Sequence, residues 1–179
     1  MVNMKKTRIG VYYFPGWEVE KRWEPVKKCN IQPLSGYYNQ SKQEIIDQQI
    51  LQASKYNVEF FAFDWYWYLN EIKLNSALET FLTSKFSKKL KFCIHWCNEA
   101  YFHPNPDGDC RKYLDWGIQW KLKPSRDFKH DFTEDDFLNC FRYVADNYFS
   151  RDNYLKIDNK PMFILYRSNL LIKIFGVEG

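Results

Sequence analysis

Short apolar segments of strand-like composition alternate along this chain with segments of helical periodicity, and this alternation constrains the fold more than any other feature. The strand-like segments comprise residues 8–14, 58–68, 90–97 and 160–166, and the helical ones comprise residues 41–53, 74–82 and 133–149. Strands that alternate with helices form parallel sheets with right-handed crossovers. We therefore expect an α/β fold of about four βα units, which corresponds to the N-terminal half of a TIM-type (β/α)8 barrel.

The chain length supports a partial barrel. The chain has 179 residues, which suits a single domain, whereas a closed eight-stranded barrel usually needs about 250 residues. We expect residues 1–179 to form one truncated barrel domain. Such a half barrel would leave strand edges unpaired near Val11 and Phe163, and unpaired edges favour self-association.

Capping side chains mark the starts of two helical segments. Ser41 with Glu44 matches a capping box, and Thr133 with Asp136 is expected to cap the last helix. Residues 17–40 are expected to form a long, polar and aromatic loop. The connection at residues 100–130 is also long, and long connections in compact domains are usually functional or disordered; its aromatic residues argue against disorder.

Motifs and charge exclude several classes of protein. The net charge is +4, and the lysines are too scattered for a nucleic-acid interface. The chain has no G-x-G-x-x-G, P-loop or G-x-S-x-G motif, and no apolar run approaches the ~18 residues that span a membrane. We therefore expect no organic cofactor, no nucleic-acid partner and no membrane span. The five cysteines, odd in number and without a C-x-x-C pair, together with a polar N-terminus, indicate a cytoplasmic protein.

Polar side chains at and near the ends of the strands are the candidate catalytic residues. Asn98 and Glu99 follow the third strand, at the edge where βα barrels carry their chemistry. Glu99 could act as a general acid or base, and Asn98 could bind sugar hydroxyls; alternatively, Glu99 is a capping residue or pairs with a lysine. Asp64, inside the apolar second strand, could complete an acid–base pair with Glu99, or it could be a structural hydrogen-bond hub.

Aromatic residues make up 20% of the chain and offer flat faces to a ring-shaped ligand. The candidates are Tyr13, Trp17, Tyr37, Trp65 and Trp96. Strand residues alternate between two faces, so about half of the strand aromatics should point into the core instead. Trp17 and Tyr37, which lie in a loop, are therefore the better binding candidates.

One face of the third strand carries Cys93, His95 and Cys97 at positions i, i+2 and i+4. Strand neighbours two apart are separated by about 6.6 Å along the axis, which is farther than the usual spacing of zinc ligands on turns. Buried core residues are therefore the favoured interpretation, and His103 with Cys110 adds only a weak metal alternative. We expect no metal.

Several stretches of the chain together resemble the WbsX-like family, also described as glycoside hydrolase family 99-like domains. They comprise residues 12–17, 32–38, 61–67, 92–99 and 154–166. The resemblance implies a TIM-type barrel that acts on glycans, either as a glycosyltransferase of bacterial surface-polysaccharide or lipopolysaccharide synthesis or as a glycosidase. It also implies a sugar-contacting half-site formed by Tyr13, Trp17, Tyr37, Trp65, Trp96, Asn98 and Glu99.

Three features depart from the family pattern. Asp64 stands where an aromatic residue is usual, the segment after Glu99 lacks the usual Asn-Trp continuation, and the chain lacks the Glu-Trp-x-Glu-Gly segment thought to hold the catalytic carboxylates. We therefore expect the chain alone to be incomplete as an enzyme. The alternatives are a non-catalytic glycan-binding or remnant domain, and a complete four-stranded α/β protein that binds a planar ligand.

Overall fold

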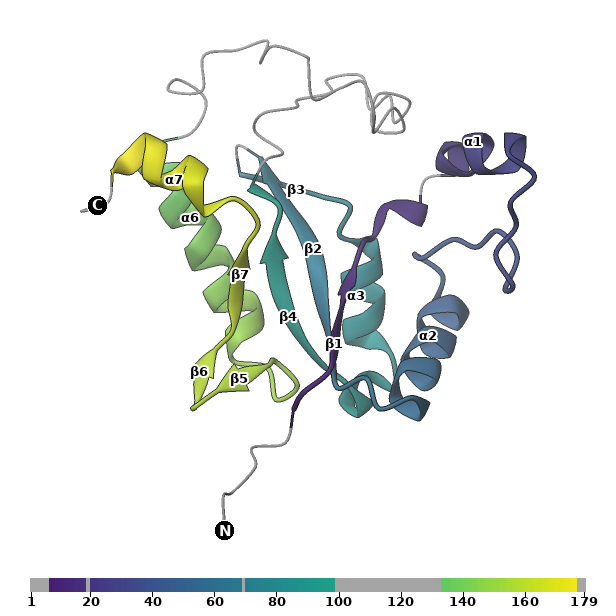
Figure 1. The fold of residues 1–179 in the computed structure, drawn as a ribbon. Coiled ribbons are helices and arrows are strands. Elements are labelled where there is room, and N and C mark those ends of the chain that lie inside the picture. The colour runs from purple at the N-terminus through teal and green to yellow at the C-terminus, as the bar shows by residue number, and fades with distance from the viewer. Residues whose placement is uncertain (1–6, 19, 69, 99–132, 177–179) are drawn as a thin grey trace.

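A parallel sheet organises the chain, as the alternation of strands and helices predicts. The computed structural model describes residues 7–18, 20–68, 70–98 and 133–176. The parallel strands lie in the order β1-β2-β4-β7, with the bounds Gly10–Tyr13, Phe60–Tyr68, Lys91–Trp96 and Phe163–Leu165. Their carboxyl ends meet at one edge of the sheet, the upper edge in Figure 1.

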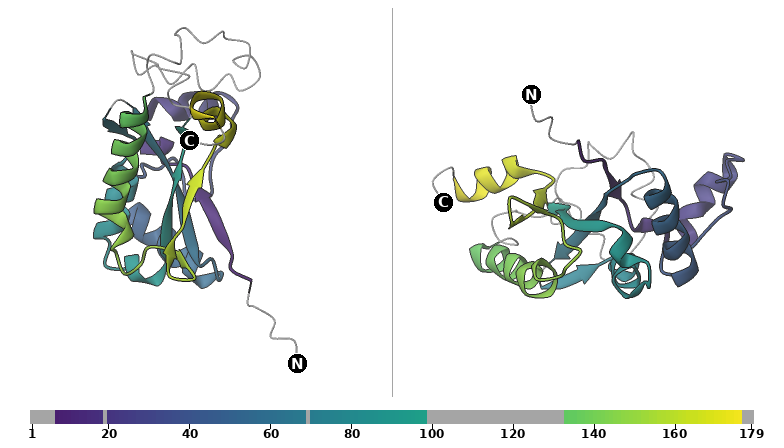
Figure 2. Two further views of the ribbon diagram at one scale, coloured as in Figure 1. Left: turned by 90° about the vertical axis from the view of Figure 1, so that its left-hand side faces the viewer. Right: turned by 90° about the horizontal axis from the view of Figure 1, so that it is seen from below.

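Among the described residues, the helices that cover the sheet lie on one of its sides, and no described helix packs over the other. The covering helices are α2 (Gln43–Lys55), α3 (Ser76–Thr83) and α6 (Glu134–Val144), which continues into a π-helical turn at Ala145–Phe149. Figure 2 shows all three on the same side of the strands. A further helix, α7 (Ser168–Phe175), follows β7. We call the uncovered side of the sheet the open face.

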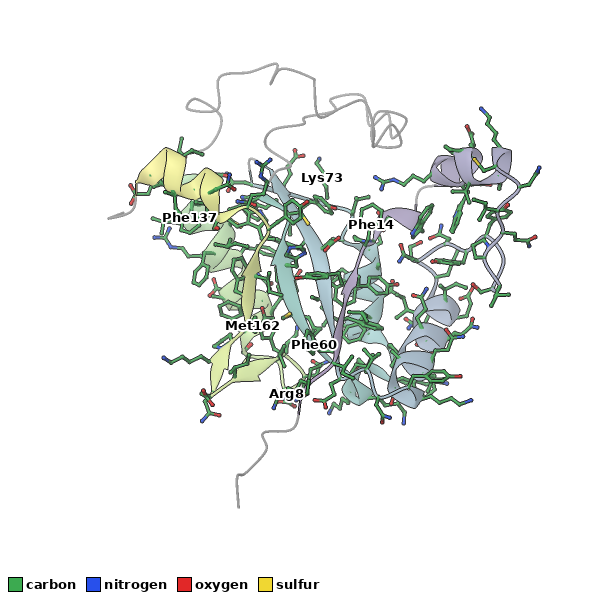
Figure 3. All side chains as sticks on the ribbon, in the orientation of Figure 1. Arg8, Phe14, Phe60, Lys73, Phe137 and Met162 are labelled. Atoms are coloured by element: carbon green, nitrogen blue, oxygen red, sulfur yellow. The ribbon has the colours of Figure 1, made fainter. Side chains whose placement is uncertain are left out.

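The core lies between the sheet and these helices because strand side chains alternate. On β2 the odd-numbered residues Phe61, Phe63, Trp65 and Trp67 are all buried, and the rings of Phe61 and Phe63 contact Phe81 of α3. The even-numbered residues of β2 therefore belong to the open face. There Phe60, labelled in Figure 3, is the register partner of Gly10. A Cβ on residue 10 would lie 2.1 Å from the Phe60 ring, so any larger residue there would force that ring to move.

The fourth strand is shorter than the sequence predicts. Residues 160–161 instead form β6 (Lys160–Pro161), which pairs antiparallel with β5 (Lys156–Ile157). The turn between them holds Asp158 and Asn159, both at positive φ, which is the conformation that two-residue hairpins require. Another short strand that the sequence did not predict, β3 (Glu71–Lys73), pairs antiparallel with the end of β2.

One predicted helix cap is confirmed and the other is wrong. Thr133 accepts a hydrogen bond from the Asp136 backbone N–H at 3.2 Å and caps α6. Ser41, however, does not cap α2, because its own backbone N–H and hydroxyl both donate to Asn39 Oδ1. The helix begins at Gln43, after Lys42 as the capping position. Local side-chain hydrogen bonds of this kind compete with helical capping.

The connection between β1 and α2, which the sequence predicted as a loop, contains helical structure. It contains helix α1 (Trp23–Lys28) and short 3₁₀ turns at Gly16–Glu18 and Glu20–Arg22. Across the described ranges, we find no helix with the length and apolar character that crossing a membrane would require.

Candidate functional site

A carboxylate and an imidazole form a pair on the open face, close to the carboxyl edge of the sheet. Asp64 on β2 and His95 on β4 are register partners, and Asp64 Oδ1 lies 2.7 Å from His95 Nδ1. The two side chains are only 17% and 8% exposed. A neutral imidazole that donates from Nδ1 to Asp64 keeps Nε2 as an acceptor. Asp64 is therefore paired inside the sheet, which avoids the cost of burying an isolated charge.

Two tyrosines flank this pair. The ring of Tyr12 on β1 lies 4.8 Å from the His95 ring, and the ring of Tyr166, just after β7, lies 5.6 Å from it. Tyr12 reaches His95 across β2 because its register partner there is Ala62, whose side chain is a single methyl group. Tyr12 is 68% exposed and Tyr166 is 47% exposed, so both rings are accessible to a ligand.

Buried thiols and a phenol lie beside the pair. Burial raises the pKa of the Tyr66 hydroxyl, and the neighbouring Cys97 and Asp64 raise it further. Burial also raises the pKa of the Cys93 thiol to about 12. Tyr66 and Cys93 therefore stay neutral at ordinary pH. Among the described residues, the group that could hold a metal ion consists of Asp64, His95 and Cys97.

The strand tryptophans expected to bind sugar lie on the other side of the sheet. Trp65 and Trp96 are each 1% exposed. Trp65 stacks on Tyr143 with ring centroids 6.1 Å apart, and Trp96 lies 5.9 Å from Phe137. Both indoles are therefore part of the core under α6, and the structure gives no support to their expected stacking role. The reason is that successive side chains of a strand point to opposite faces. Trp65 follows Asp64 and Trp96 follows His95, so both tryptophans point away from the open face.

Tyr13 and Asn98 also hold the structure together. The Tyr13 hydroxyl donates to Gln49 Oε1 of α2 at 2.5 Å, on the covered side of the sheet. Asn98 is 2% exposed, and its side chain exchanges two hydrogen bonds with the Arg167 backbone. Neither side chain is directed at the Asp64–His95 pair.

Trp17 and Tyr37 form a separate aromatic cluster around Trp23 of α1. Trp17 stacks on Trp23 with ring centroids 4.0 Å apart, and Tyr37 meets Trp23 edge-on at 5.3 Å. The Tyr37 hydroxyl donates to the Ile31 carbonyl. Figure 1 shows α1 beyond β1, on the side of α2 and away from β4 and β7. The structure therefore does not bring this cluster together with Asp64.

Glu99 lies outside the described residues, as do His103 and Cys110. The predicted pairing of Glu99 with Asp64 stays a prediction. Tyr12 and Tyr166 were not predicted from the sequence as site residues. His95 was considered only as a core residue or a metal ligand.

Comparison with known proteins relates the chain to carbohydrate-active proteins. A family model described as Glycosyltransferase WbsX matches residues 14–177. The uncharacterized protein WxcX of Xanthomonas campestris pv. campestris, from two strains, is 25% identical over an alignment of 164 residues. The match covers 88% of this chain and 21% of WxcX. The chain thus spans about a fifth of the length of these curated relatives.

Solved structures of one enzyme share the fold. A structure of the GH99 endo-α-mannosidase from Bacteroides thetaiotaomicron, in complex with BIS-TRIS-propane, matches with a TM-score of 0.59 and 18% identity, over 97% of this chain and 48% of that one. A second structure of that enzyme matches with a TM-score of 0.50, over 83% of this chain and 36% of that one. At this identity the likeness concerns the fold alone, and it agrees with the predicted partial barrel.

Proposed function

The chain belongs to the WbsX glycosyltransferase family, and we propose that it binds a glycan on the open face of its sheet, at the Asp64–His95 pair. A carbohydrate-active domain of this family implies a glycan substrate. The observation that carries the proposed position is the hydrogen bond between Asp64 and His95 at the end of the sheet where barrel enzymes carry their chemistry.

The chemistry of the open face suits a sugar. A sugar presents hydroxyl groups around its ring and apolar C–H groups on its faces. Asp64 and His95 offer hydrogen-bond acceptors to the hydroxyl groups. Tyr12 and Tyr166 offer exposed aromatic rings against which the C–H face can pack.

The proposed reaction is glycosyl transfer or the hydrolysis of a glycosidic bond. In either case His95 would accept the proton of an attacking hydroxyl group or water at Nε2. Asp64 would hold the imidazole in the correct tautomer and stabilise its charged form. Glu99, which immediately follows Asn98 in the sequence, is the proposed second carboxylate, acting as acid or base on the other reacting oxygen.

The proposed substrate is a polysaccharide or oligosaccharide, and mannose-containing chains are the first to test. The support is the family together with the shared fold of the endo-α-mannosidase. We further propose a role in the synthesis of a bacterial surface polysaccharide, such as lipopolysaccharide, inside the cytoplasm. Both follow from the resemblance and the cysteine pattern, and both stay predictions.

Binding of α-linked mannose oligosaccharides to the 179-residue chain, measured by isothermal titration calorimetry, tests the proposal. We expect Asp64→Asn to weaken binding at least tenfold. The matched control is Asp146→Asn, which makes the same chemical change at an exposed position after α6, on the covered side. Unchanged affinity in Asp64→Asn, with binding present in the wild type, would remove Asp64 from the site. Product analysis by mass spectrometry then separates transfer from hydrolysis.

A non-catalytic glycan-binding domain is the second candidate function. The observation that favours it is that the described sheet does not close into a barrel. Within the described residues, β1 pairs only with β2, and β7 pairs in the sheet only with β4. A closed barrel gives every strand two neighbours. Glycan binding without turnover by the 179-residue chain would favour this second candidate.

A further inference from the structure

Side chains with the chemistry of metal ligands converge on the open face. Asp64, His95 and Cys97 each offer one ligand atom, and these atoms all lie within 4.8 Å of one another. Register pairing places Asp64 of β2 opposite His95 of β4. Cys97 follows two residues after His95, on the same face of the chain. The carboxylate thus comes from the neighbouring strand, which the spacing within a single strand cannot reveal.

We propose that Asp64, His95 and Cys97 bind a divalent transition-metal ion, with Zn²⁺ as the best match. Thiolate, imidazole and carboxylate are the ligands that zinc takes, whereas Mg²⁺ and Ca²⁺ prefer all-oxygen sites. Three protein ligands leave one tetrahedral position for water or for a hydroxyl group of a bound molecule. The ligand set is thus that of an open zinc site rather than of a closed structural one.

The observed geometry is close to what such an ion needs. Bonds of about 2.0–2.3 Å place tetrahedral ligand atoms about 3.3–3.7 Å apart. Asp64 Oδ1 and His95 Nδ1 are 2.7 Å apart, so an ion would separate them slightly while the thiol approaches.

The surroundings also suit a metal site. His95 and Cys97 are 6% and 4% exposed, so few waters compete for the ion. The carboxylate is 17% exposed, which leaves a path from solvent. Metal binding by a thiol releases its proton, and an ion of charge +2 stabilises the thiolate that results.

Titration of the 179-residue chain with Co²⁺, followed by absorption spectroscopy, tests the proposal directly. Co²⁺ in a thiolate-containing tetrahedral site gives a thiolate-to-metal charge-transfer band and intense visible bands. We expect both bands in the wild type at about one ion per chain, and we expect Zn²⁺ to displace them. Asp64→Asn should weaken Co²⁺ binding at least about tenfold, because losing a direct carboxylate ligand should cost no less than losing an outer-shell partner.

Two buried thiols on β4 and directly after it provide a matched pair of variants. Cys97→Ala should abolish the charge-transfer band, whereas Cys93→Ala should keep it, because Cys93 is outside the group of ligand atoms. Near-UV circular dichroism checks that each variant is folded. If Cys97→Ala does not fold, mass-spectrometric mapping of the wild type answers the same question. Under mild unfolding Zn²⁺ should protect Cys97 from alkylation more strongly than Cys93, because Cys93 is protected only through stabilisation of the fold whereas the ligated thiolate is also blocked directly.

Three results would overturn the site: no Co²⁺ bands in the folded wild type, a charge-transfer band that survives Cys97→Ala, or equal protection of both thiols by Zn²⁺. The test of the metal site does not depend on glycan binding, because the absorption bands report the ligands themselves. The ion would take the His95 Nδ1 lone pair and leave the proton on Nε2, so the metal-bound form and the form in which His95 acts as a base are alternative states of the same residues. Binding of mannose oligosaccharides without Co²⁺ binding would support the proposed function and contradict the metal site. Co²⁺ binding without oligosaccharide binding would support the metal site and contradict the proposed function.

Discussion

Asn98 joins the ends of two neighbouring parallel strands by pairing with the backbone of Arg167. Its side-chain Nδ2 donates to the Arg167 carbonyl at 3.0 Å, and its Oδ1 accepts from the Arg167 N–H at 2.9 Å. The amide thus behaves as one more residue of the ladder between β4 and β7, just beyond the hydrogen bond from the Tyr166 N–H to the Trp96 carbonyl. Asn98 therefore fixes where the chain leaves β7 at the carboxyl edge.

We expect Asn98→Ala to lower the free energy of unfolding by about 2–4 kcal/mol, because the Arg167 N–H and carbonyl both lose their partner in a part-buried position. Urea unfolding followed by far-UV circular dichroism measures this change. The control is Asn169→Ala, an exposed position on α7, which should change stability by no more than about 0.5 kcal/mol. Equal effects of the two substitutions would mean that Asn98 does not hold the strands together.

Thr133 is the second residue whose substitution should have a defined cost. Its hydroxyl accepts from the Asp136 N–H, and Asp136 Oδ1 in turn accepts from Trp67 Nε1 at 3.2 Å, so the cap lies next to the contact that ties α6 to β2. We expect Thr133→Ala to cost about 1 kcal/mol and Thr133→Ser, which keeps the hydroxyl, to cost much less. Thermal unfolding of the three proteins compares them, and a Ser variant as unstable as the Ala variant would contradict a capping role.

The sheet and its covering helices could be predicted from the sequence because each depends on a local period. The helical stripe of α6 and its Thr133 cap are both local patterns, and both are confirmed. The start of α2 is different: Asn39 binds Ser41 first, and the sequence does not show which of two competing local hydrogen bonds forms. The short hairpin of β5 and β6 depends on positive φ at Asp158 and Asn159. The apolar residues that follow Lys160 favoured the prediction of one continuous strand there, so the hairpin was not predicted.

The candidate site could be predicted only in part. Asp64 was identified because a carboxylate in an apolar strand needs a partner. Its partner His95 depends on the register of β2 against β4, which a single sequence does not contain. The face of the sheet to which Trp65 points could, however, have been predicted from the sequence. A residue next to Asp64 in a strand points to the opposite face, so Asp64 on the open face places Trp65 in the core.

The stability of the fold should fall at alkaline pH. Burial raises the pKa of Cys93 to about 12 and raises the pKa values of the Tyr148 and Tyr154 hydroxyls above their usual value. In the unfolded chain these groups ionise near pH 8.5–10. Above about pH 8.5 the unfolded state therefore binds fewer protons than the folded state, so the free energy of unfolding decreases as pH rises. Each group contributes up to about 1.4 kcal/mol per pH unit within its window.

Urea unfolding at a series of pH values measures this slope. We expect the contribution of these groups to the free energy of unfolding to stay nearly constant below about pH 8 and to fall increasingly steeply above about pH 9. Cys93→Ala should remove the contribution of the Cys93 thiol. The plot of unfolding free energy against pH should then be flatter near pH 9–10, below the range in which the tyrosines of the unfolded chain ionise. Stability that is constant up to about pH 11 would show that these groups ionise as easily in the folded chain as in the unfolded one.

The edge strands of the sheet should make the chain associate with itself. β1 pairs in the described sheet only with β2, and it carries Val11, which is 39% exposed. Ile9, which precedes the strand, is 53% exposed. An edge strand with apolar side chains is a template for pairing with another chain, and a lysine on the edge opposes that pairing. We expect sedimentation velocity to show a concentration-dependent dimer. Val11→Lys should weaken the dimer by about tenfold, which equals about 1.4 kcal/mol.

The control for this prediction is Leu34→Lys, which adds the same charge at a fully exposed apolar residue in the connection between α1 and α2, outside the sheet. Because both variants raise the net charge by the same amount, general charge repulsion would affect them equally. Loss of association only in Val11→Lys therefore identifies the edge of β1 as the contact. A wild-type chain that stays monomeric at all concentrations, or equal weakening by both lysines, would mean that the β1 edge is not an association site.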